Sequence, residues 1–156
     1  MRLVETERAS EGALMIYLIG VNHALQSDAP SRANKLRIVR EKRASFKAHA
    51  LEVIKEFNIT ILAEEFNDEA KKIWGVSETT LEKFGKAKGI KHRFCEPGRE
   101  EVWLSQIEDC KEENMLFVCG DDHFESFGKT LLPRVSMLSM GRDGISVDDE
   151  FFFSDP

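Results

Sequence analysis

Four short runs of apolar residues stand out along the chain, and each of them ends at a glycine or a glutamate. They cover residues 13–19, 58–63, 90–95 and 115–119, of which the third is the weakest. Continuous apolar runs of this length are typical of strands that are covered on both faces, as in a parallel sheet. The pattern therefore predicts four buried strands.

Helical periodicity fills the segments between these runs, because apolar residues recur there at spacings of three and four. The longest helix is expected over residues 31–57, with Pro30 near its start. Shorter helices are expected over residues 68–74, 77–88, 100–113 and 126–132. Strand and helix thus alternate four times, which is the pattern of right-handed βαβ units.

We therefore expect an α/β fold, a three-layer sandwich with a mainly parallel sheet of four to six strands. A length of 156 residues suits one hydrophobic core, so residues 1–156 are expected to form a single domain. Two further apolar segments, 135–140 and 145–147, are compatible with a hairpin or with one more edge strand. Three phenylalanines at 151–153 either fold onto the body or form an exposed contact patch.

Charge and composition limit the partners of the chain. The net charge of −6 argues against general nucleic-acid binding, because phosphate backbones favour a positive surface. The longest apolar run, residues 13–21, is too short to span a bilayer, and mainly acidic residues precede it instead of the basic segment of a signal peptide. We therefore expect a cytoplasmic protein without a membrane partner. The three cysteines form no Cys-x-x-Cys pair, and Cys119 is expected to be a buried free thiol.

Two of the predicted strands run into the same short motif, Gly-x-x-His, at residues 20–23 and 120–123. The other two strands end at Glu64 and Glu65 and at Glu96. Since open parallel sheets bind ligands at the carboxyl ends of their strands, these residues are expected to meet in one cleft. Two imidazoles with nearby carboxylates can ligate a divalent metal ion or act as general acid and base.

The candidate catalytic residues are therefore His23, Glu64, Glu65 and His123. His23, Glu64 and His123 are also the candidate metal ligands, and an ion such as Mn²⁺, Co²⁺ or Zn²⁺ suits them better than Mg²⁺ does. The candidate substrate-binding residues are Asn22, Arg32, Glu96, Asp121 and Asp122. The alternative interpretation is that these polar residues only cap helices and form solvated loops. The recurrence of Gly-x-x-His in equivalent places favours a functional site.

A basic segment occupies the first part of the long predicted helix, with one acidic residue among seven basic ones. The basic residues are Arg32, Lys35, Arg37, Arg40, Lys42, Arg43 and Lys47. Most are expected to line a solvated face, but Arg32 and Arg43 lie on the apolar stripe. We expect Arg32, in the first turn, to hold an anionic group of a substrate. Arg43 is expected to be half-buried and to pair with a carboxylate.

Common nucleotide-binding motifs are not supported. Gly128, Lys129 and Thr130 match the end of a phosphate-binding P-loop, but that motif needs glycine where His123 stands. The sequence also contains no Gly-x-Gly-x-x-Gly segment, so a dinucleotide cofactor is not expected.

The order of the motifs along the chain resembles that of the erythromycin-esterase, Tiki/TraB and ChaN-type superfamily. A strand with Gly-x-x-His comes first, a glutamate follows the second strand, and a late strand leads into Gly-x-x-His and a helix. The similarity covers residues 13–132. The resemblance implies a hydrolytic, often metal-dependent site formed by His23, Glu64 or Glu65, and His123, while ChaN-type members bind haem. Two features depart from the superfamily: Val21 stands where many members have glutamate, and the long helical insertions of larger relatives are missing.

The expected function is that of a small metal-assisted hydrolase with a His/Glu site at the carboxyl edge of the sheet. Its partner would be a small molecule, for which Arg32 suggests an anionic group. The competing hypothesis is a non-catalytic ligand-binding or regulatory protein that keeps the fold without the chemistry. Val21 and the small size favour this alternative, whereas the two histidines and the glutamate favour the enzyme.

Overall fold

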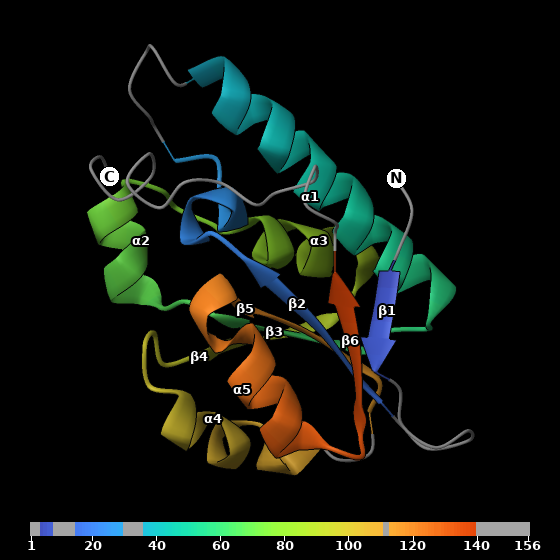
Figure 1. Cartoon of the computed structure of the whole chain (residues 1–156). Helices are drawn as coiled ribbons and strands as arrows, with labels where there is room; N and C mark the ends of the chain where they lie inside the picture. Colours follow the sequence, from blue (N-terminus) through green and yellow to red (C-terminus); the bar gives the residue numbers. More distant parts are fainter. Residues whose placement is uncertain (1–3, 8–14, 30–35, 111–112, 140–156) are drawn as a thin grey trace.

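The structure, a computed structural model, describes residues 4–7, 15–29, 36–110 and 113–139 (Figure 1). One six-stranded sheet has the order β1-β6-β2-β5-β3-β4. Its strands are β1 (Val4–Glu7), β2 (Ile16–Val21), β3 (Ile61–Glu65), β4 (Lys91–Cys95), β5 (Met115–Gly120) and β6 (Val135–Ser139). The strands β2 to β6 pair in parallel, and β1 pairs antiparallel with β6 at the edge. The predicted α/β fold with a mainly parallel sheet is confirmed.

Helices cover both faces of this sheet and so form a three-layer sandwich. The helices are α1 (Leu36–Glu56), α2 (Asp68–Trp74), α3 (Thr80–Lys88), α4 (Glu100–Gln106) and α5 (Asp121–Leu131), with the short 3₁₀ helices η1 (His23–Gln26) and η3 (Glu108–Cys110). In Figure 1, α1 and α3 lie on one face, and α4 and α5 lie on the other. No helix in the described part of the chain combines the length and apolar character needed to cross a membrane.

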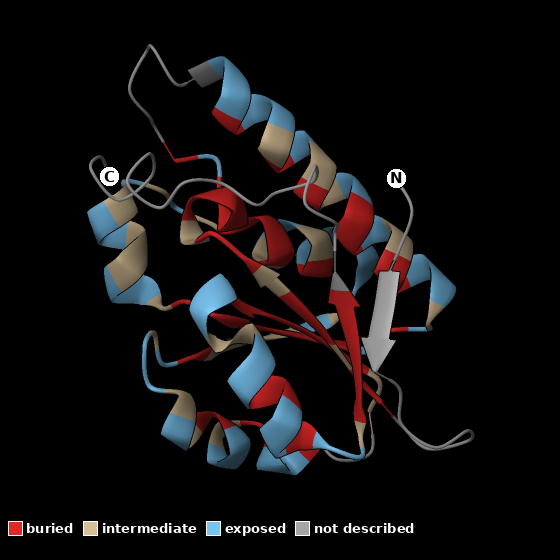
Figure 2. Cartoon of the chain, viewed as in Figure 1, coloured by how far each residue is buried: buried red, intermediate tan, exposed pale blue. Residues whose placement is uncertain are grey.

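The central strands are buried on both sides, as their apolar runs predicted (Figure 2). Leu62 and Val118 pack with α1 and α3, while their strand neighbours Ala63 and Phe117 pack with α4 and α5. Burial of one such large apolar side chain contributes roughly 1.5–3 kcal/mol. Because both faces are apolar, the strands need helices on both, which gives the three layers. Cys119 is a buried free thiol, as expected.

Several element boundaries differ from the expected ones. Strand β3 includes Glu64 and Glu65, which were expected to follow the strand. Helix α5 begins at Asp121 directly after β5, and not at residue 126, because acidic residues in a first turn stabilise the helix N-terminus. Helix α4 ends at Gln106 and a tighter 3₁₀ turn follows, so the expected helix over 100–113 is wrong at its end.

The far edge of the sheet is also different from the expectation. Strand β6 lies between β1 and β2, so it is an interior strand and not an edge. Strand β1 was not predicted, because Val4–Glu7 is short and mostly polar. Segment 145–147, the phenylalanines at 151–153 and Arg32 lie outside the described residues.

The connections of β2 and β5 create a crevice at the carboxyl edge of the sheet. These strands are neighbours, and their register pairs Val21 with Gly120. The helix that follows β2 covers one face, whereas α5 after β5 covers the other (Figure 1). Neighbouring strands whose connections leave in opposite directions form a topological switch point, where α/β proteins bind ligands.

Candidate functional site

A cleft of about 390 Å³ lies at this switch point. It is lined by Val21, Asn22, His23, Glu65, Pro97, Gly98, Gly120, Asp121, Asp122 and His123. Its volume is in the range of small-molecule sites. Both Gly-x-x-His motifs therefore reach the same cleft, one through η1 and the other through the first turn of α5.

Glu65 is the buried centre of the cleft, with a side chain only 1% exposed. Its Oε1 accepts a hydrogen bond of 2.8 Å from the Gly120 N–H, and its Oε2 accepts one of 2.7 Å from the Gly98 N–H. Oε2 also lies 3.5 Å from Nε2 of His23 and 3.9 Å from Nε2 of His123. The structure thus brings together His23, Glu65 and His123 around one carboxylate oxygen.

The orientation of the His23 ring follows from its neighbour Gln26. The amide nitrogen of Gln26 donates to Oε1 of Glu64 at 3.0 Å and to the Glu65 carbonyl at 3.2 Å. The amide oxygen of Gln26 therefore faces Nδ1 of His23, at 2.7 Å, and accepts its proton. In the neutral ring, Nε2 then carries a lone pair that points into the cleft.

His123 is oriented in the same way by Glu100. Its Nδ1 lies 2.8 Å from Oε1 of Glu100, and the Ser126 hydroxyl donates to the same oxygen at 2.6 Å. A carboxylate only accepts, so Nδ1 of His123 donates and Nε2 faces the cleft. The Trp103 ring packs edge-on against the imidazole at a centroid distance of 5.1 Å. An imidazole backed by a carboxylate is the arrangement of a catalytic base.

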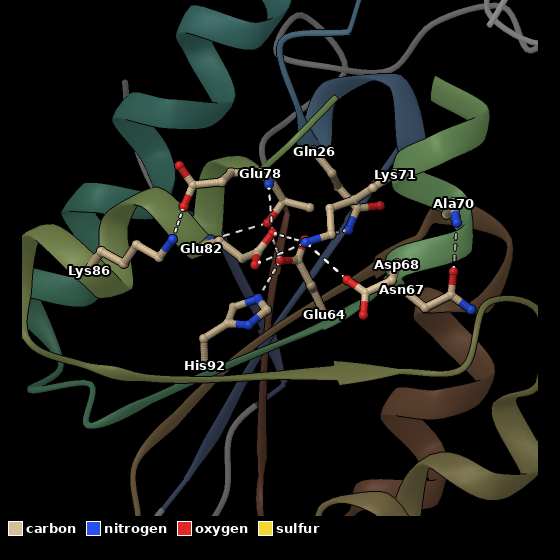
Figure 3. A network of polar contacts seen from close by, with 11 residues as sticks. Gln26, Glu64, Asn67, Asp68, Ala70, Lys71, Glu78, Glu82, Lys86 and His92 are labelled. Atoms are coloured by element: carbon tan, nitrogen blue, oxygen red, sulfur yellow. Dashed lines mark hydrogen bonds and ion pairs between the residues drawn. The ribbon is translucent and has the colours of Figure 1, made fainter. Parts of the chain in front are cut away.

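Glu64 does not line the cleft, although it is one residue from Glu65. Successive side chains of a strand point to opposite faces, and both glutamates belong to β3. Glu64 is fully buried on the far side, where it accepts from Gln26, from the Thr79 hydroxyl at 2.6 Å and from Nε2 of His92 at 2.6 Å (Figure 3). Among its described contacts, the hydrogen bond from Gln26 is the one that connects Glu64 to the cleft.

The expected metal ligands His23, Glu64 and His123 are therefore not assembled around one point. Within the described residues, no group of three or more His, Cys, Asp and Glu side chains is arranged to hold a metal ion. The hydrogen bonds at Nδ1 of His23 and His123 do resemble those that orient the rings of metal-binding histidines from outside the metal site. Metal binding stays a prediction.

The other candidate residues divide into three groups. Asn22, Asp121 and Asp122 line the cleft. Glu96 is exposed and does not line it, although the next residues, Pro97 and Gly98, do. Arg32 lies outside the described residues, and the described lining contains no lysine or arginine.

Arg43 contacts the backbone of η1, the short helix that carries His23. It is 6% exposed, and its Nε donates a 2.9 Å hydrogen bond to the carbonyl of Ala24 in η1. The described hydrogen-bond partner is thus a backbone carbonyl, and the expected carboxylate interaction comes from the charge of Asp28. Burial lowers the pKa of the guanidinium, and the Asp28 carboxylate opposes this shift. Arg43 ties α1 to the turn that carries His23.

The two glycines of the repeated motif have different steric roles. A Cβ atom at Gly120 would lie 2.8 Å from Nε2 of His23 and 3.2 Å from Oε1 of Glu65. A Cβ atom at Gly20 would lie 2.7 Å from Cβ of Phe124. Gly120 therefore makes room for the site, whereas Gly20 lets α5 pack closely on β2.

The residues that orient the histidines, Gln26 and Glu100, are not among the candidates that the sequence suggests. Gln26 follows His23 by three residues, a spacing that a 3₁₀ turn brings together. Glu100 begins α4, 23 positions before His123, so no local pattern connects the two.

Comparisons of the chain with protein-family models, with curated proteins and with solved structures give no match. The resemblance to the erythromycin-esterase, Tiki/TraB and ChaN-type superfamily therefore rests on the short motifs alone.

Proposed function

We propose that this protein is a small hydrolase in which His23, Glu65 and His123 activate water in the cleft. One observation carries the proposal. A single oxygen of the buried Glu65 carboxylate lies 3.5 and 3.9 Å from the two Nε2 atoms, while both Nδ1 atoms are anchored by other side chains. Two imidazoles and a carboxylate that face one another can pass a proton between them, so the cluster suits proton transfer.

His123 is the general base of this reaction. Its Nε2 takes a proton from water as the water oxygen attacks the electrophilic atom of the substrate. The carboxylate of Glu100 at 2.8 Å stabilises the imidazolium that forms, as the acidic member of a catalytic triad does.

His23 is the general acid. In its protonated form it pairs with Glu65, and it gives its Nε2 proton to the leaving group as the scissile bond breaks. Glu65 then takes the proton from His123 and returns it to His23, because the carboxylate is close to both rings. Water thus supplies the hydroxyl of one product and the proton of the other.

The metal-assisted form of the reaction also remains a prediction. An ion would have to use the two Nε2 atoms, and we assign no step to it because the described residues form no group of three ligands. The proton transfers above need only side chains of the cleft.

The test is hydrolysis of a panel of p-nitrophenyl carboxylic and phosphate esters by the wild type, Glu65→Gln and His123→Asn. Loss of a positioned acid or base lowers rates by about 10²–10⁴, so both variants should lose at least about a hundredfold in kcat. Glu101→Gln is the matched control, because Glu101 is exposed on α4, pairs with Arg99 and does not line the cleft. Equal rates in all four proteins would refute the proposal and favour the non-catalytic alternative.

A further inference from the structure

Asn22 holds an unpaired donor beside the catalytic histidine. Its Oδ1 accepts a 3.0 Å hydrogen bond from the Ala24 N–H, which caps η1 and sets the orientation of the amide. The residue is 4% exposed and lines the cleft, yet its Nδ2 has no hydrogen-bond partner among the described residues. A buried donor without an acceptor is unfavourable, so Nδ2 is suited to meet an acceptor on a ligand.

The N-terminus of α5 supplies further donors to the same cleft. This helix runs from Asp121 to Leu131, and its N-cap residue, Gly120, makes no side-chain cap. The first N–H groups of a helix have no acceptor within it, and the helix dipole places partial positive charge there. Asp121, Asp122 and His123 of this turn all line the cleft.

The sheet register places these two sets of donors next to each other. Val21 pairs with Gly120, so Asn22 and Asp121 are the next residues at the ends of neighbouring strands. Neighbouring strands lie about 4.8 Å apart, which is a separation that one oxygen atom of a ligand can bridge. The amide of Asn22 and the first turn of α5 therefore border the same space, beside His23.

The charge of the cleft decides which oxygen fits there. Its lining carries the carboxylates of Glu65, Asp121 and Asp122, and no lysine or arginine is among the described lining residues. A ligand that is already an anion is repelled by the carboxylates of Glu65 and Asp122. A neutral carbonyl is not, and its oxygen gains negative charge only in the transition state, where donors are most effective.

We infer that Asn22 Nδ2 and the first turn of α5 form an oxyanion site, and that the substrate is an uncharged carboxylic ester or amide. The inference rests on the proposed hydrolase function. Attack by water moves the π electrons of the carbonyl onto its oxygen, which these donors bind. Collapse of the intermediate re-forms the carbonyl and expels the leaving group, which takes its proton from His23.

The test compares wild type, Asn22→Ser and Asn22→Asp with p-nitrophenyl acetate as substrate. Serine and aspartate both keep an oxygen that caps η1 but remove the amide donor. Loss of one oxyanion donor lowers kcat by about 10²–10³, so Asn22→Ser should show this loss with little change in KM or in the pH profile. Asn22→Asp should lose more, because it places a carboxylate beside the oxyanion, and it decides the matter if the serine variant does not fold.

Asn67→Ser is the matched control. Asn67 caps α2 through the same contact, with its Oδ1 accepting from the Ala70 N–H at 2.8 Å, and it does not line the cleft. The control should therefore keep the wild-type kcat. If the wild type cleaves the acetate ester and both Asn22 variants keep its kcat, the oxyanion role is wrong while the hydrolase proposal stands. If the wild type cleaves only p-nitrophenyl phosphate, the uncharged substrate class is wrong and an anionic substrate is favoured.

Discussion

The buried histidine on α1, His49, predicts how the stability of this protein depends on pH. Its side chain is fully buried on the helix face that also carries Phe46 and Val53. Neither ring nitrogen has a hydrogen-bond partner among the described residues. Burial lowers the pKa of His49 from its usual 6.5 to about 4, because the charged ring would lose its hydration.

The size of the effect follows from this shift in the His49 pKa. Below pH 6.5 the unfolded chain binds a proton at this histidine, while the native protein does not bind it until the pH approaches 4. One pKa unit corresponds to about 1.4 kcal/mol, so the free energy of unfolding should fall by about 3 kcal/mol between these limits. The stability is present above pH 6.5 and is lost as the pH falls.

The measurement is urea unfolding of wild type and His49→Leu at several pH values from 7.5 to 4. Leucine has a similar volume and does not titrate, so the difference between the two proteins isolates His49 from the carboxylates that both share. The wild type should lose about 3 kcal/mol more than the variant over this range. Two parallel stability curves would refute the reasoning and show that the ring is hydrated or paired in solution.

Two further predictions concern the cleft. Gly120→Ala should lower kcat at least about tenfold with a small change in Tm, because the new Cβ would lie 2.8 Å from Nε2 of His23 while the backbone, at φ −64° and ψ 149°, suits alanine. Steady-state kinetics and thermal unfolding check this, and an unchanged kcat would show that the ring can move aside. Mn²⁺, Co²⁺ or Zn²⁺ should raise the Tm of the wild type but not that of a double variant with His23→Ala and His123→Ala, because an ion bound only by the native state stabilises it. If no ion raises the Tm of the wild type, the metal-binding prediction is wrong and the proposed hydrolysis depends on the side chains of the cleft.

Much of the fold was readable in the sequence because its signals are local. A strand covered on both faces must be apolar throughout, so the run ending at Gly120 predicted β5. Helix ends were readable where a special residue marks them, as Gly89 does with its left-handed backbone at the end of α3. The predicted start of α3 at Ser77 is wrong, because Thr79 is the N-cap and forms the capping box with Glu82. The sequence offers several hydroxyl side chains there and does not show which one caps the helix.

The edge at β1 and β6 was not readable in this way. Strand β1 pairs with a strand more than a hundred residues away, and its four residues carry no apolar run. Pairing over such a separation depends on the assembled sheet. The unpaired N–H and C=O groups on the edge of β6 can form hydrogen bonds with any extended segment that lies beside them.

The site shows the same division between local pattern and tertiary contact. Both Gly-x-x-His motifs were visible because each lies at the carboxyl end of its strand, and parallel strands place such ends at one edge. The choice between Glu64 and Glu65 was not visible, since the two have the same chemistry and are adjacent. Only the pleat of β3 sends Glu65 to the histidines and Glu64 to the opposite face, where its partner His92 lies in β4.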